Sequence, residues 1–299
     1  MKPLRIQNKY QLDLRLGGGS FGEVYQGHDL ETGEEIALKL ELERSFRFNS
    51  HLCNEIEIYK ALSGGPGIPQ LYWDGYECQF TVMAFELLGP TLEDLLNYCG
   101  RKFSLKTVLL LTDQLISRFQ YLHSKGYIHR DVKPNNLLMG DGKQGARVYM
   151  SDLGLAKRID VWDRTEPLLG TVLFASISAH VGKEQQTPCD DMESLGYVLL
   201  YFLRGYLPWE GLKAESEEQV EKLVLEKKQS PEDCGLFKNL PGEFKKYFEH
   251  LRSVETPDYS YLRRLFRNLF RRNGFESDSV FDWTELKFLE ELERRKKAG

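Results

Sequence analysis

The sequence predicts an α+β chain of two lobes: a small N-terminal lobe of antiparallel strands with one helix, and a larger, mainly helical C-terminal lobe. Its 299 residues are long for a single core. Runs of Val, Ile, Phe and Tyr, broken by Gly-rich turns, continue to about Phe85 and are typical of strands. After Leu92 apolar residues recur every three or four positions, which is typical of helices. The Gly89-Pro90 pair separates the two patterns, so we assign 1–88 to the first lobe and 89–299 to the second.

Composition narrows the classes of function. The net charge of −5 argues against general affinity for nucleic acids. The first residues lack the apolar core of a signal peptide, and no apolar run approaches the ~20 residues of a membrane span. The cysteines are odd in number and show no C-x-x-C spacing. We therefore expect reduced thiols in the cytoplasm or nucleus, without zinc or disulfides.

A glycine-rich segment lies between two strand-like stretches. Gly17, Gly19, Gly22 and Val24 fit the pattern G-x-G-x-x-G-x-V. Hairpin turns also favour glycine, so the pattern alone is weak evidence. A dinucleotide fingerprint would be followed by a helix, whereas here a strand follows. We expect a hairpin whose backbone amides, from Gly18 to Gly22, cover the phosphates of a nucleotide.

A lysine at the end of an apolar strand is the next candidate. Ile36-Ala37-Leu38-Lys39 matches the V-A-I-K strand, whose lysine holds the α- and β-phosphates of ATP. A strand lysine is more often a solvated edge residue, so a carboxylate partner is required. The helix expected over 54–62 offers Glu55 and Glu57. These two lie on different helix faces, so at most one pairs with Lys39, and spacing alone does not choose.

Two motifs in the middle of the chain indicate phosphoryl transfer. The segment 129–136 spells H-R-D-V-K-P-N-N, and a D-L-G turn begins at Asp152. This is the chain order of protein kinases. Asp131 would orient the attacking hydroxyl, and Asn136 and Asp152 would hold Mg²⁺ on the phosphates of ATP. Lys133 would stabilise the charge that develops on the γ-phosphate.

Six stretches add to these motifs, and one of them overlaps the segment 129–136. They are E-L-L-G-P-T-L-E-D-L at 86–95, R-K-F-S-L-K-T-V at 101–108, Y-I-H-R-D-V-K-P at 127–134, D-D-M-E-S-L-G-Y at 190–197, L-P-W-E-G-L-K-A at 207–214 and P-D-Y-S-Y-L at 257–262. With them the chain resembles the casein kinase 1 family of serine/threonine protein kinases, from Tyr10 to about Phe288. Where most kinases carry A-P-E, that family has Ser-Ile-Asn, and this chain has Ser-Ile-Ser at 176–178.

The resemblance implies an active kinase that uses ATP and Mg²⁺ to phosphorylate serine and threonine on protein substrates, as a monomer. It selects Glu55 as the partner of Lys39, and it makes Phe85 the gatekeeper that closes the pocket behind the adenine. The catalytic residues are then Asp131, Lys133 and Thr171, and the metal ligands are Asn136 and Asp152. The nucleotide-binding residues are Gly17, Gly19, Ser20, Gly22, Val24, Ala37, Lys39, Glu55, Phe85, Glu86 and Leu88, with backbone groups of Glu86 and Leu88 facing the adenine.

The chain departs from the family in two places. Relatives bind the phosphate of a pre-phosphorylated substrate through basic residues, but the three corresponding positions here are Glu166, Leu173 and Glu217. Carboxylates would repel that phosphate, so we predict that this anion site is lost, and neutral surface change is the alternative. Leu153 replaces the phenylalanine of D-F-G, and because leucine is also apolar we expect no loss of activity.

Two other classes of function remain open. A pseudokinase scaffold would keep the fold and bind partners through surfaces such as the acidic stretch 214–221. A small-molecule phosphotransferase of related fold would lack the peptide-binding segment 170–178, which is present here. We assign His129 and Asp191 to bracing the catalytic loop rather than to chemistry. The other histidines, His180 among them, are expected on the surface or in the core.

Overall fold

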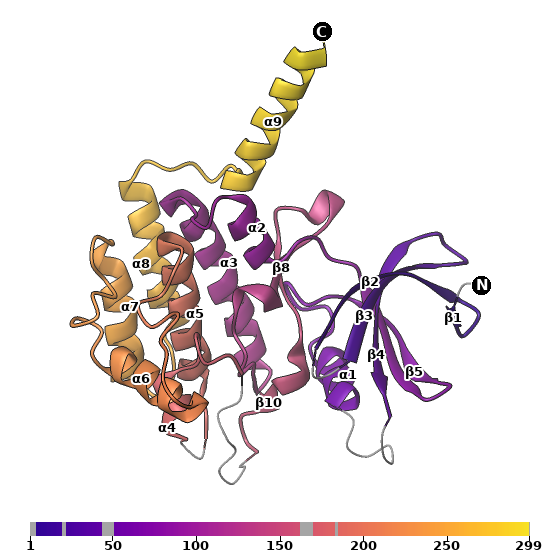
Figure 1. Cartoon of the computed structure of the whole chain (residues 1–299), viewed down its shortest axis with the longest axis horizontal. Helices are drawn as coiled ribbons and strands as arrows, with labels where there is room; N and C mark the ends of the chain where they lie inside the picture. The colour runs from indigo at the N-terminus through magenta and orange to yellow at the C-terminus, as the bar shows by residue number, and fades with distance from the viewer. Residues whose placement is uncertain (1–3, 20–21, 44–50, 162–169, 183–184, 299) are drawn as a thin grey trace. The chain divides into compact units, whose positions relative to one another are not determined.

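A computed structural model describes residues 4–19, 22–43, 51–161, 170–182 and 185–298 (Figure 1). The chain forms two compact units. One comprises Met1–Gly89 with Leu138–Ala156, and the other comprises Pro90–Leu137 with Lys157–Gly299. The first is rich in strands and the second is mainly helical, which confirms the predicted α+β fold class.

An antiparallel six-stranded sheet forms the first unit, in the order β1-β2-β3-β4-β6-β5. Its alternating apolar side chains make one core on the sheet face that includes Tyr10, Leu38 and Val82. The strands are β1 (Arg5–Ile6), β2 (Tyr10–Gly19), β3 (Gly22–Asp29), β4 (Glu35–Leu42), β5 (Leu71–Glu77) and β6 (Phe80–Glu86).

A helix and a returning segment complete this unit. Gly89 N donates to Met139 O at 2.9 Å, and Met150 N donates to Gly67 O at 2.8 Å. These bonds join residues 138–156 to the N-terminal strands and helix. The predicted division of the chain into 1–88 and 89–299 does not include this later segment in the first unit. The elements are α1 (His51–Ala61), the hairpin of β8 (Leu137–Met139) and β9 (Val148–Met150), and the short 3₁₀ turns Gly142–Gln144 and Leu153–Leu155.

The second unit is built around α5, which is buried on nearly all sides and packs against α3 and α7. Asp190 in its first turn forms a capping box with Thr187, which fixes where the helix begins. The elements are α2 (Leu92–Tyr98), α3 (Leu105–Ser124), β7 (Tyr127–Ile128), the 3₁₀ turn Pro134–Asn136, β10 (Lys157–Arg158), α4 (Ile177–Val181), α5 (Pro188–Arg204), α6 (Glu217–Gln229), α7 (Gly242–Ser253), α8 (Tyr259–Arg272) and α9 (Asp282–Ala298).

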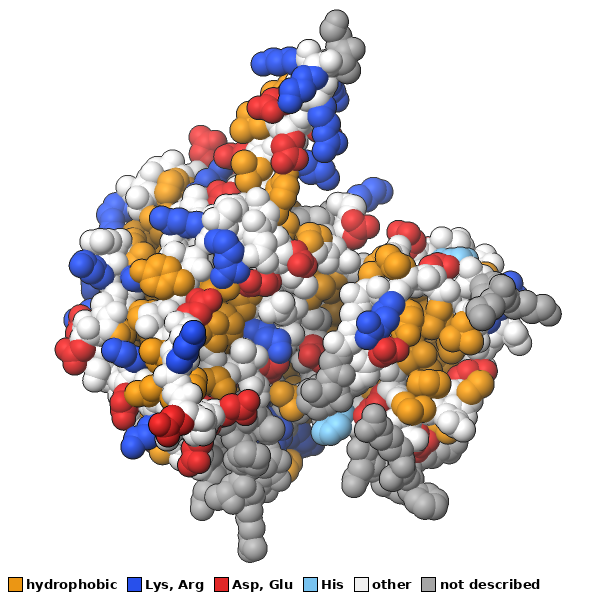
Figure 2. All heavy atoms as spheres, in the orientation of Figure 1, with side chains coloured by type: hydrophobic (Ala, Val, Ile, Leu, Met, Phe, Trp, Pro, Cys, Tyr) orange, Lys and Arg blue, Asp and Glu red, His pale blue; other side chains and the backbone are white. Residues whose placement is uncertain are grey.

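The last helix, α9, is anchored at its start by hydrogen bonds and ring contacts. Asp282 accepts hydrogen bonds from Ser104 N and Oγ, both at 2.6 Å, and Trp283 stacks on Phe281. Its later residues are exposed, and Figure 2 shows Lys and Arg side chains along its outer part. Among the helices that the structure describes, none is both long and apolar enough to cross a membrane.

Candidate active site

Strand β4 and helix α1 bring together the predicted lysine and one of its two candidate partners. Lys39 Nζ donates to Glu55 Oε2 at 2.7 Å and to Asp152 Oδ1 at 2.9 Å. The side chains of Lys39 and Glu55 are buried, with 8% and 1% of their surface exposed. Glu57 lies on the exposed side of α1 and accepts from Lys60 at 3.1 Å. Glu55 is therefore the glutamate that pairs with Lys39.

The two carboxylates keep Lys39 charged. Burial alone would lower the pKa of Lys39, but the nearby carboxylates of Glu55 and Asp152 outweigh it and raise the pKa above its ordinary value. The result is a fixed ammonium in a buried position, which is the group required to hold phosphate oxygens.

The D-L-G turn fits closely against α1. Asp152 adopts the left-handed backbone conformation, with φ 56°. Leu153 is fully buried, and its backbone bonds to the Glu55 carboxylate. Leucine therefore fills an apolar position beside α1, as expected for the residue that replaces phenylalanine.

The glycine-rich segment forms the predicted strand–loop–strand hairpin. Gly17 pairs with Val24, and Gly19 pairs with Gly22. Gly22 has φ +122°, and a Cβ there would collide with the Leu40 carbonyl, so this position requires glycine. Ser20, at the tip, lies outside the described residues, so the phosphate-covering role of the tip stays a prediction.

The residues predicted to surround the adenine lie on β3, β4 and β6. Val24 pairs with Lys39 across β3 and β4, and Ala37 pairs with Phe85 across β4 and β6. The Phe85 ring stacks on buried Tyr59 of α1 at a centroid distance of 6.3 Å. Phe85, the predicted gatekeeper, therefore packs against a second aromatic ring.

The predicted hinge begins at Glu86, the last residue of β6. Glu86 N donates to Gln70 O at 2.8 Å, and Glu86 Oε2 accepts from Gln70 N at 3.1 Å. Because the backbone N–H of Glu86 is bonded within the protein, the backbone carbonyl of Glu86 is the group that we predict to face the adenine. Leu88, the other predicted adenine contact, is half-buried.

A second cluster, in the helical unit, is centred on Asp131. Lys133 Nζ donates to Asp131 Oδ2 at 2.6 Å, and Thr171 Oγ1 donates to Asp131 Oδ1 at 2.9 Å. Asn136 Nδ2 donates to Asp131 O at 2.9 Å and to Asp131 Oδ2 at 3.2 Å. The three predicted catalytic side chains therefore lie in contact, with one predicted metal ligand beside them.

Asp191, at the start of α5, holds the turn that carries Asp131. Its carboxylate accepts from His129 N at 2.7 Å, from Arg130 N at 2.9 Å and from His123 Nε2 at 2.8 Å. Burial would raise the pKa of Asp191, but the bonds from His123 and His129 hold the pKa below its ordinary value. Arg130 has φ 68°, so this buried anion fixes a backbone conformation that non-glycine residues seldom adopt.

The activation segment returns to the same turn at Gly170. This residue has φ +89°, and a Cβ there would lie 2.6 Å from Arg130 O. Only glycine allows this close approach, which places the following Thr171 hydroxyl on Asp131.

The donor chemistry of Asn136 and Asp152 fits Mg²⁺. Both supply hard oxygen ligands, and Mg²⁺ commonly binds one or two protein ligands together with waters and substrate phosphates. The amide nitrogen of Asn136 is bonded to Asp131, so its amide oxygen is the atom suited to a metal. Within the described ranges no cluster of three His, Cys, Asp or Glu side chains could hold a metal. Bound Mg²⁺ would neutralise charge on the β- and γ-phosphates.

One comparison with known proteins identifies the class. The family described as "Protein kinase domain" matches residues 10–266, a span that includes both clusters. The chain therefore belongs to the protein kinase domain family. ATP-dependent phosphoryl transfer is the general activity of that family.

Sequence reasoning missed one buried cation. Lys228 of α6 is fully buried, although it belongs to the charged run E-K-K that is typical of an exposed helix end. A signal for its burial was present. Val220, Val224 and Lys228 recur every four residues and so share one face of a helix.

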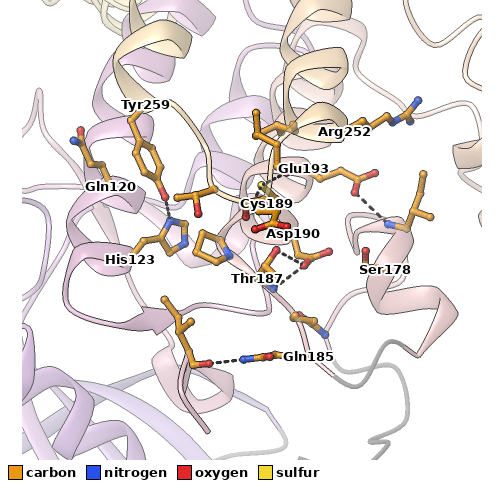
Figure 3. A pocket seen from close by; sticks show the side chains of 18 of the residues that line it. Gln120, His123, Ser178, Gln185, Thr187, Cys189, Asp190, Glu193, Arg252 and Tyr259 are labelled. Atoms are coloured by element: carbon orange, nitrogen blue, oxygen red, sulfur yellow. Dashed lines mark hydrogen bonds between the residues drawn. The ribbon is translucent and has the colours of Figure 1, made fainter. Parts of the chain in front are cut away.

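The helical unit also contains a cavity of about 1070 Å³, bordered by α3, α4, α5, α7 and α8 (Figure 3). Several of the polar side chains that line it are hydrogen-bonded within the protein. Tyr259 bonds His123 at 2.6 Å, Thr187 Oγ1 donates to Asp190 at 2.9 Å, and Gln185 donates to Ile159 O at 2.5 Å. These groups support the helices, and they assign no ligand to the cavity.

Proposed function

We propose that the chain transfers the γ-phosphoryl group of ATP, with Mg²⁺, to serine and threonine hydroxyls of protein substrates. The observation that supports this most directly is the cluster in which Lys133 and Thr171 each bond one oxygen of Asp131. Asp131 then orients the substrate hydroxyl and accepts its proton. Lys133 stabilises the negative charge of the transition state, and Thr171 holds the Asp131 carboxylate in place.

The first unit would supply the nucleotide site. The Lys39 ammonium, fixed by Glu55, would hold the phosphates, and Asp152 and Asn136 would bind Mg²⁺. A pseudokinase scaffold is the alternative, although the full catalytic set is present in the sequence. Incubation with radiolabelled ATP, Mg²⁺ and casein distinguishes the two. The proposal expects labelled casein, and its absence from folded, ATP-binding protein would favour the scaffold.

We further propose a casein kinase 1 type of enzyme that has lost the usual phosphate site for primed substrates. Leu173 has an apolar side chain, and its carbonyl accepts from Trp209 Nε1 at 2.8 Å. Glu217 is exposed in the first turn of α6. Glutamate at a helix N-terminus is also favoured by the helix dipole, which is a structural reason for the acidic stretch. Glu166 lies outside the described residues.

A pair of peptides tests this second proposal. One carries a phosphoserine three residues before the target serine, and its twin carries serine there. A charged hydrogen bond contributes ~1.5–3 kcal/mol, less when exposed, so loss of the basic residues removes roughly tenfold selectivity or more. We expect the wild-type enzyme to show little preference for the primed peptide. The double variant Leu173→Arg/Glu217→Lys should gain one.

The control is Glu226→Lys, an exposed site on the same helix that also changes the sign of one charge. It should leave the ratio of kcat/KM values unchanged. A wild-type enzyme that already prefers the primed peptide by about a hundredfold would contradict the loss of the site, without touching the kinase assignment.

A further inference from the structure

Lys228 is bonded to the substrate-side segment of the activation loop. Its Nζ donates to Val172 O at 2.8 Å and to Ala175 O at 2.7 Å. The third neighbour is His180 Nε2 of α4, at 3.0 Å. The three N–H groups of an ammonium are thereby all used, and two of them bond the backbone that directly follows Thr171.

Aromatic rings take the place of a counter-ion. Lys228 Nζ lies 5.0 Å from the centroid of the Tyr197 ring and 5.3 Å from that of Trp209. The two rings meet edge to face, with centroids 5.1 Å apart. No carboxylate within salt-bridge distance of Lys228 is found in the described part of the chain. Burying an ammonium without a counter-ion costs free energy. The hydrogen bonds to the segment and the contacts with the two rings offset this cost.

The same segment is fixed from the other side. Trp209 Nε1 donates to Leu173 O at 2.8 Å. Thr171 O accepts from Phe174 N at 2.9 Å and from Ala175 N at 3.0 Å. Lys228 and Trp209 therefore fix the carbonyls of three residues, 172, 173 and 175, in a turn that begins at Thr171. The Thr171 hydroxyl is bonded to Asp131.

We propose that Lys228 is a positioning residue for the protein substrate: it holds the turn 172–175 in the shape that receives the peptide. This rests on the kinase function proposed above. Lys39 and Asp152 belong to the other unit, whereas the three groups that Lys228 bonds all belong to the helical unit. Loss of the Lys228 side chain should therefore weaken binding of the peptide substrate and leave ATP binding and ATP hydrolysis unchanged.

The test compares Lys228→Met with Lys227→Met, its exposed neighbour on the same helix. Two reactions are measured on each purified protein: phosphorylation of a serine peptide, and hydrolysis of ATP without peptide. For Lys228→Met we expect the peptide KM to rise about tenfold, the loss typical of a buried charged hydrogen bond. The KM for ATP and the hydrolysis rate should stay within about twofold.

The comparison of the two reactions distinguishes a positioning role of Lys228 from a general loss of folded protein. A variant that is merely partly unfolded would lower both rates together and leave the peptide KM unchanged, and that result would overturn the proposal. An unchanged peptide KM in a fully active Lys228→Met protein would do the same. If the wild-type protein shows ATP hydrolysis but no peptide phosphorylation, the proposed function fails first, which is a distinguishable outcome.

If Lys228→Met does not fold, a milder variant tests the same positioning role. Trp209→Phe removes only the donor to Leu173 O and keeps an aromatic ring near Lys228. It should raise the peptide KM in the same direction by a few-fold, with the KM for ATP unchanged. A lower peptide KM, or equal losses in both reactions, would count against the shared role of the two side chains.

Discussion

Two buried lysines, one in each unit, are held in opposite ways. Lys39 faces two carboxylates, and their charges raise its pKa. Lys228 faces two carbonyls, a histidine and two aromatic rings, and burial lowers its pKa to about 7. His180 beside it has its own pKa lowered to about 4 by burial and by Lys228, so it accepts as a neutral ring.

The difference shows that a buried lysine has no single function. Where carboxylates surround it, the ammonium is a permanent charge that can hold a polyanion. Where only dipoles and rings surround it, the same group is a hydrogen-bonding brace whose charge is marginal at neutral pH. The first arrangement suits a ligand site, and the second suits a structural joint.

The largest effect is expected from removing the paired lysine. Lys39→Met should lower kcat for casein phosphorylation by about 10²–10³, because a preorganised charge on the phosphates is lost. Asp131→Asn should cause a similar loss through the hydroxyl, with a smaller fall in ATP binding. Steady-state kinetics and nucleotide titration measure both. Near-normal turnover in Asp131→Asn would remove its catalytic assignment.

The second prediction concerns the pH dependence of stability. The pKa of Lys228 is lower in the folded chain, about 7, than the ordinary 10.5 of the unfolded chain. As pH falls from 10.5 towards 7, the unfolded chain binds a proton that the folded chain does not, so stability is lost over that window. The free energy of unfolding of the wild type minus that of Lys228→Met should therefore rise by about 2 kcal/mol over two pH units above 7.5.

Urea unfolding at several pH values measures this difference, in which the titration of the other groups largely cancels. Lys227→Met is the matched control, and its difference from the wild type should stay flat. A flat curve for Lys228→Met as well would mean that Lys228 keeps an ordinary pKa, and the contrast with Lys39 would then disappear.

Much of the first lysine's surroundings could be predicted from the sequence. The strand that carries Lys39 and the glycine hairpin are local patterns, and both are present, although the strand continues beyond Lys39 to Leu42. The choice between Glu55 and Glu57 was not local, because it depends on how α1 lies against β4 and on the position of Asp152, far along the chain.

Lys228 could not be assigned from local pattern in the same way. Its partners Val172, Ala175 and His180 are about fifty residues away, and two of them contribute backbone carbonyls, which leave no trace in the sequence. Only the four-residue spacing from Val224 indicates that Lys228 faces inward. Backbone acceptors are visible only once the fold is known.

A substitution near Lys39 tests whether the surroundings of Lys39 can be changed without affecting Lys228. Phe85→Ala should open the space beside Tyr59 and improve binding of ATP-site inhibitors with bulky groups by roughly tenfold or more. Inhibition curves on parent and variant measure it. The pH dependence at Lys228 should not change. Equal potency on both proteins would mean that Phe85 is not the gatekeeper.

The smallest expected effect concerns the charge that opposes the lowering of the Lys228 pKa by burial. Among the described residues, the charge of Glu193 of α5 raises the pKa of Lys228 against the effect of burial. Its oxygens accept from Tyr197 OH at 2.6 Å and from Ile177 N at 3.4 Å. In Glu193→Gln the amide oxygen can accept from Ile177 N and the amide N–H can donate to the Tyr197 hydroxyl, while the charge is removed, so the pKa of Lys228 should fall further.

The measurement repeats the pH series on Glu193→Gln with and without Lys228→Met. The pH at which their difference begins to rise should move below 7 by a fraction of a unit, because one charge is removed without a direct contact. Glu226→Gln, exposed on α6, should leave that pH unchanged. An unchanged pH in Glu193→Gln would show that the pKa of Lys228 does not depend on this carboxylate. The carbonyls and rings would then be the whole of its electrostatic environment, and its difference from Lys39 would be larger than the structure implies.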